Sequence, residues 1–107
     1  MEKDLRIGVY LDYYRSLLTA KQADAVDLYF NHDLSLAEIG ENLGITRQAA
    51  RDAIKRGGDA LAGFEASFGL YNKDIAVGRL LEIIDGMEQS PYLDEIKQLI
   101  ESLQTIV

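Results

Sequence analysis

The sequence contains no cysteine, one proline and one histidine among 107 residues. Without cysteine, the chain can form neither disulfides nor thiolate metal sites, and it has no thiol nucleophile. A lone histidine, His32, leaves zinc without a sufficient ligand set, so no metal or other cofactor is expected. With one proline and no Gly/Ser-rich tract, no flexible linker is expected either.

Long apolar runs are also missing. Charged residues interrupt the apolar positions of the first eighteen residues, whereas a membrane span needs about 20 consecutive apolar residues. A signal peptide likewise needs an uninterrupted apolar core. We therefore expect a cytoplasmic protein with no membrane insertion. No serine has a plausible base partner and no phosphate-binding loop occurs, so the sequence does not indicate an enzyme and offers no catalytic residues.

Helical spacing of apolar residues dominates what is present, and no segment shows sustained two-residue alternation. The pattern predicts an all-α fold. A first helix is expected over residues 7–18, with Tyr10 and Tyr14 on its buried face and Tyr13 pointing elsewhere. Later helices are expected to begin at five capping signals: Thr19, Ser35, Thr46, Asn72 and Ser90-Pro91.

The fourth predicted helix is long, running to about Phe68 with a soft point at Gly57-Gly58, and Gly69 is expected to end it. The chain then divides into a helix-turn-helix domain over residues 1–69 and a helical hairpin over residues 70–107. The hairpin is apolar enough to pack on the first domain or on a second copy of the chain. The hairpin carries an apolar stripe made of Leu80, Ile83, Ile84, Leu99, Ile100 and Leu103. The expected homodimer contact uses part of this stripe together with three residues of the long helix: Leu61, Phe64 and Phe68.

Residues 34–57 read LSLAEIGENLGITRQAARDAIKRG, a short helix, a glycine-containing turn and a second helix. This arrangement is typical of the helix-turn-helix unit. Gly40 is small where the two helices would cross, and Gly44 allows the positive φ of the turn. Ile39, Leu43 and Ile45 would bury the inner faces.

Charge is unevenly distributed along the chain. The net charge is −7 overall, yet residues 44–58 carry +3 and residues 59–107 carry −6. Long polar side chains fall on the second helix of the unit, where arginine and glutamine can read base edges and lysine can contact phosphate. The candidate nucleic-acid-binding residues are Arg47, Gln48, Arg51, Lys55 and Arg56. The same pattern also fits a packing unit with a solvated charged face.

Several segments together resemble one family of small bacterial proteins. They include DYYRSLLTAKQ, GITRQAARDAIKR and FEASFGLY, and the likeness continues into the acidic tail. The chain is similar to the YlxM family, whose members are encoded beside genes of the signal recognition particle (SRP) GTPase. The helix-turn-helix of that family resembles region 4 of bacterial sigma factors.

The resemblance implies a regulatory protein of the SRP pathway that forms dimers and binds SRP RNA, the SRP GTPase or DNA. A different class of function also fits the sequence. The acidic C-terminal helices could bind a basic partner such as the SRP GTPase, with the helix-turn-helix serving only as scaffold.

Overall fold

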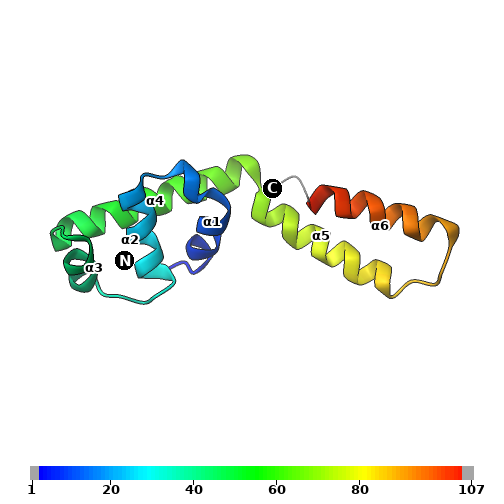
Figure 1. Cartoon of the computed structure of the whole chain (residues 1–107), viewed down its shortest axis with the longest axis horizontal. Helices are drawn as coiled ribbons and strands as arrows, with labels where there is room; N and C mark the ends of the chain where they lie inside the picture. Colours follow the sequence, from blue (N-terminus) through cyan, green and yellow to red (C-terminus); the bar gives the residue numbers. More distant parts are fainter. Residues whose placement is uncertain (1–2, 105–107) are drawn as a thin grey trace. The chain divides into compact units, whose positions relative to one another are not determined.

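The computed structural model describes residues 3–104, which form helices joined by turns and loops (Figure 1). This confirms the all-α prediction. The chain separates into two compact units, residues 1–68 and residues 69–107. The elements are α1 (Arg6–Tyr14), η1 (Arg15–Leu17), α2 (Ala20–Phe30), α3 (Leu36–Leu43), α4 (Arg47–Phe68), α5 (Leu70–Asp85) and α6 (Pro91–Gln104). None of the helices within residues 3–104 has the length and apolar composition needed to cross a membrane.

The first helix is shorter than predicted. It ends at Tyr14, and the single 3₁₀ turn η1 follows it. Leu18 is then extended, with φ −100° and ψ 158°. This extended residue brings the chain into the non-helical conformation that an N-cap at Thr19 requires.

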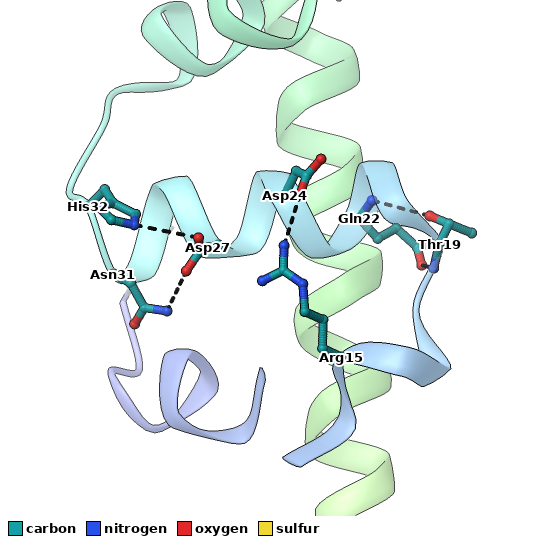
Figure 2. A network of polar contacts seen from close by, with 7 residues as sticks. All are labelled: Arg15, Thr19, Gln22, Asp24, Asp27, Asn31 and His32. Carbon is teal, nitrogen blue, oxygen red and sulfur yellow. Dashed lines mark hydrogen bonds and ion pairs between the residues drawn. The ribbon is translucent and has the colours of Figure 1, made fainter. Parts of the chain in front are cut away.

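Polar contacts fix α2 at both ends (Figure 2). At its start, the Thr19 hydroxyl accepts from the Gln22 backbone N–H at 3.2 Å, and the Gln22 side chain accepts from the Thr19 N–H at 3.3 Å. This is the predicted capping box. At its end, the Asp27 carboxylate accepts from Asn31 Nδ2 at 2.8 Å and lies 3.5 Å from Nε2 of His32.

The turn between α3 and α4 has the predicted helix-turn-helix geometry. Gly44 is left-handed at φ 67°, and the Ile45 N–H donates to the Gly40 carbonyl at 2.9 Å, as in a Schellman motif. A Cβ at Gly40 would lie 2.8 Å from the Ile45 carbonyl oxygen, so this glycine is required by a close backbone approach. The Thr46 hydroxyl accepts from the Ala49 N–H at 3.0 Å and caps α4.

Helix α4 is the centre of the first unit, because α1, α2 and α3 all pack on it (Figure 1). The helix is continuous through Gly57-Gly58, so the expected soft point is not observed as an interruption. Gly57 is buried, and a Cβ there would lie 2.7 Å from Cγ2 of Val26. Gly57 therefore permits close packing of α2 on α4.

The buried hydrophobic residues of the first unit come from all four of its α-helices. They are Ile7, Leu11, Tyr14, Ala23, Ala25, Val26, Ile39, Ala50, Ile54 and Leu61. Leu61 is fully buried in this core, so its predicted place in a dimer contact is wrong. Tyr14 packs on Phe64, with ring centroids 5.9 Å apart, and its hydroxyl donates to Glu65 Oε1 at 2.7 Å.

In the second unit, α5 and α6 form a hairpin. Helix α5 begins at Leu70 after the left-handed Gly69 rather than at the predicted Asn72 cap. The α6 start is as predicted, since the Ser90 hydroxyl accepts from the Tyr92 N–H at 3.3 Å ahead of Pro91. The hairpin core consists of Val77, Ile84, Leu93 and Ile100, with Leu81 packed against it.

Several apolar residues of α5 lie in solvent, because two helices bury only one narrow stripe between them. Ile84 is buried, whereas Ile75, Leu80 and Ile83 of α5 and Met87 just after it are exposed. The Lys73 ammonium donates to the Leu103 carbonyl at 2.9 Å and thereby joins the start of α5 to the end of α6. A cation beside the C-terminus of α6 also interacts favourably with the negative end of that helix's dipole.

Candidate nucleic-acid interface

The first two turns and a half of α4 carry the predicted site residues. All five are exposed: Arg47, Gln48, Arg51, Lys55 and Arg56. The inner face of α4 is fixed by four buried residues: Ala50, Ile54, Gly57 and Leu61. Because an α-helix has about 3.6 residues per turn, positions two residues after a buried one point almost directly away from the core.

The side of α4 that faces away from the core includes two acidic residues. Asp52 and Asp59 each lie two residues after a buried residue and share one face, seven residues apart. The predicted arginines lie on either side of these two aspartates. Arg47 and Arg51 are on the flank next to Ile54, and Arg56 is on the opposite flank. The structure therefore does not bring all five predicted residues onto one edge.

Surface hollows show which residues the fold brings together. A first one, here the Tyr29 hollow, has a volume of about 510 Å³ and is lined by Tyr29, Leu36, Arg47, Gln48 and Arg51. A second, the Ile7 hollow, has a volume of about 420 Å³, and its lining includes Arg51 and Lys55. Arg51 lines both hollows, so they adjoin along one flank of α4. Arg56 lines a separate hollow with Lys21 and Asp52.

Two of the candidate side chains already contact acidic neighbours on α4. Gln48 Nε2 donates to Asp52 Oδ1 at 3.1 Å, and the Lys55 ammonium lies 3.4 Å from Asp59 Oδ2. Among residues 3–104, no acidic side chain is paired with Arg47, Arg51 or Arg56. These three guanidinium groups retain their full donor capacity for an external anion.

Tyr29 and Phe30 were missed as site residues by sequence reasoning. Both are only half-buried. Tyr29 lines the Tyr29 hollow, and Phe30 lines the Ile7 hollow. Their helical spacing is the same as that of core residues, so no local signal distinguished them. Their place in the site follows from tertiary packing. The C-terminal turn of α2 ends beside the flank of α4 that carries Arg47, Arg51 and Lys55, here called the cationic flank.

A known family matches almost the whole chain. Its description is "Putative helix-turn-helix protein, YlxM / p13 like", and the match covers residues 1–106. The chain belongs to this family, UPF0122. A UPF0122 protein of Clostridium novyi is 38% identical over 111 residues, covering 100% of this chain and 96% of the relative.

Other UPF0122 relatives agree over the same extent. One of Clostridium kluyveri is 39% identical, covering 94% of this chain and 96% of its own length. One of Streptococcus pneumoniae is 36% identical, covering 99% of this chain and 94% of its own length. The UPF0122 assignment confirms the predicted family and agrees with the helix-turn-helix geometry at Gly40 and Gly44.

Within residues 3–104, no three acidic or histidine side chains come together as metal ligands.

Proposed function

We propose that this UPF0122 protein binds nucleic acid through the cationic flank of α4 and acts as an accessory factor of the SRP pathway. Its ligand would be SRP RNA or DNA. The observation that carries the nucleic-acid proposal is the exposure of Arg47 and Arg51 without acidic partners in residues 3–104 of a chain with net charge −7. The SRP part rests on the resemblance to proteins encoded beside SRP genes.

The acidic remainder of the molecule supports a confined interface. Phosphate is repelled by the negatively charged body and attracted where unpaired cations lie. Arg47 and Arg51 contribute to the Tyr29 hollow, and Lys55 extends the flank toward α1. A ligand held this way would be released by salt, with a log–log slope of about −0.9 per neutralised phosphate on duplex DNA and about −0.7 on a single strand.

Charge reversal on the flank tests this proposal. In the full chain, Arg47→Glu with Arg51→Glu should abolish retention of labelled SRP RNA and of duplex DNA in a gel shift. The matched control is Arg79→Glu with Lys97→Glu, which makes the same change in net charge within the second unit. Equal loss in the two double variants would show a general charge effect and refute a local interface.

The rival function is an adaptor that binds the SRP GTPase through the acidic C-terminal helices. The observation favouring it is the exposed apolar surface of the hairpin, where Leu99 is 62% and Ile75 is 56% exposed. In that case Arg47→Glu with Arg51→Glu should leave pull-down of purified SRP GTPase unchanged. The same exposed surface supports the homodimer proposal. If the protein sediments with the mass of a monomer at micromolar concentration, the homodimer proposal is refuted.

A further inference from the structure

The Tyr29 hollow differs in charge from the other hollows of the first unit. Its lining combines one aromatic ring, one leucine, one amide and two guanidinium groups, and it includes no carboxylate. The Ile7 hollow is lined by Asp4 and Asp59, and the hollow beside Arg56 is lined by Asp52. An anion bearing a flat apolar group therefore fits the Tyr29 hollow best. A nucleotide has this combination, with its phosphate and its base.

The aromatic wall of this hollow is held in place before any ligand arrives. The Lys3 ammonium lies 4.3 Å from the Tyr29 ring centroid and also pairs with Asp33 at 2.7 Å. Phe30 meets the Tyr29 ring edge-to-face, with centroids 5.0 Å apart and an interplanar angle of 89°. A ring fixed by its neighbours loses little conformational freedom on binding, which favours affinity.

The charge pattern of α4 favours one strand over two. A duplex groove surrounds an inserted helix with phosphates from both strands. On α4 the side that faces away from the core carries Asp52 and Asp59 beside Arg56, so two carboxylates would enter such a groove. A single strand can instead follow one flank. Arg47, Arg51 and Lys55 are spaced four residues apart, which places them at intervals of about 6 Å along the axis.

We propose that the Tyr29 hollow binds an unpaired nucleobase. The base stacks on the face of the Tyr29 ring opposite the Lys3 ammonium, while Arg47 and Arg51 hold the phosphates on either side of the base. The preferred ligand is thus a loop, bulge or single-stranded segment of RNA rather than a regular duplex. This inference rests on the proposed function, and it assigns to the same interface a class of ligand.

The test compares three labelled probes by fluorescence anisotropy at one stated salt concentration. They are an RNA hairpin with an oligouridine loop, the blunt RNA duplex of its stem, and the loop sequence as single-stranded DNA. The variants in the full chain are Tyr29→Leu, which keeps apolar volume, and Tyr29→Phe, which keeps the ring. Tyr92→Leu in α6 is the matched control, and circular dichroism checks folding.

The expected result is a preference of the wild type for the hairpin over the blunt duplex. Tyr29→Leu should weaken hairpin binding by roughly fivefold to a hundredfold, the usual effect of losing one stacked base. Tyr29→Phe and Tyr92→Leu should stay close to wild type. Retention of the single-stranded DNA equal to that of the RNA would also support the pocket, because every base offers a stacking face.

Two other outcomes separate the failure of this inference from that of the proposed function. If the wild type binds duplex and hairpin equally, or if Tyr29→Leu matches Tyr92→Leu, the base pocket is refuted and the cationic interface stands. If the wild type retains none of the probes, both proposals fail. Should Tyr29→Leu not fold, light-induced cross-linking of 5-bromouridine in the loop decides, since a cross-link away from Tyr29 refutes the pocket.

Discussion

Gly57 gives the sharpest test of how α2 packs on α4. A Cβ at this position would lie 2.7 Å from Val26 Cγ2 and 3.5 Å from Gln22 Cβ. Val26 is fully buried and β-branched, so its methyl group cannot rotate away. Overpacking of this kind costs about 1–3 kcal/mol, while replacing glycine by alanine within a helix returns about 1 kcal/mol. Gly57→Ala should therefore destabilise the protein by up to about 2 kcal/mol.

The same helix provides the control. A Cβ at Gly63 would meet nothing within 4 Å, so Gly63→Ala should stabilise by about 0.5–1 kcal/mol through helix propensity alone. Urea unfolding followed by far-UV circular dichroism measures both variants in the full chain. In a Val26→Ala background, Gly57→Ala should become neutral or stabilising, because the obstructing methyl group is gone. If Gly57→Ala stabilises as much as Gly63→Ala, the described α2–α4 contact is refuted.

Three further predictions concern single polar contacts. Lys73→Ala removes the bond to the Leu103 carbonyl and should cost about 1 kcal/mol, seen as faster hydrogen exchange in α6 with the first unit unchanged. Tyr14→Phe removes the donor to Glu65 and should lower the unfolding free energy by about 1.5 kcal/mol; an unchanged urea midpoint would contradict it. The backbone N–H of the N-cap serine, which donates to Glu38, holds the pKa of that carboxyl below its ordinary 4.5. A lowered pKa stabilises the fold at higher pH, so stability should fall as the pH drops below about 5, and less steeply in Glu38→Gln.

Local chemistry made much of the fold predictable. Capping by Thr19, Ser35 and Thr46 depends on residues three positions apart, and each cap is present in the structure. The left-handed turn at Gly44 follows from the same short-range rules. These signals predicted the helix-turn-helix without reference to the rest of the chain, and they also located the exposed arginines.

Tertiary features were predicted less well. The Asn72 cap signal was overridden, since α5 starts at Leu70 directly after the left-handed Gly69. The glycine pair was interpreted through helix propensity, whereas Gly57 is explained by its contact with Val26. Tyr29 has the spacing of a core residue and lines a hollow only because of where α2 meets α4. Periodicity identifies the inner face of a helix, but not where that face ends beside a neighbour.

The contact between Gly57 and Val26 bears on recognition as well as on stability. Val26 is one turn of α2 away from Tyr29, and Gly57 follows Arg51 by less than two turns of α4. The separation of α2 and α4 therefore determines how far the Tyr29 ring lies from the Arg51 guanidinium, and hence the width of the Tyr29 hollow. A relative with a larger residue at the position of Gly57 would need a smaller one opposite it, or its cleft would open and grip a flat ligand less tightly. A buried glycine that contacts no ligand would then influence which ligands the surface accepts.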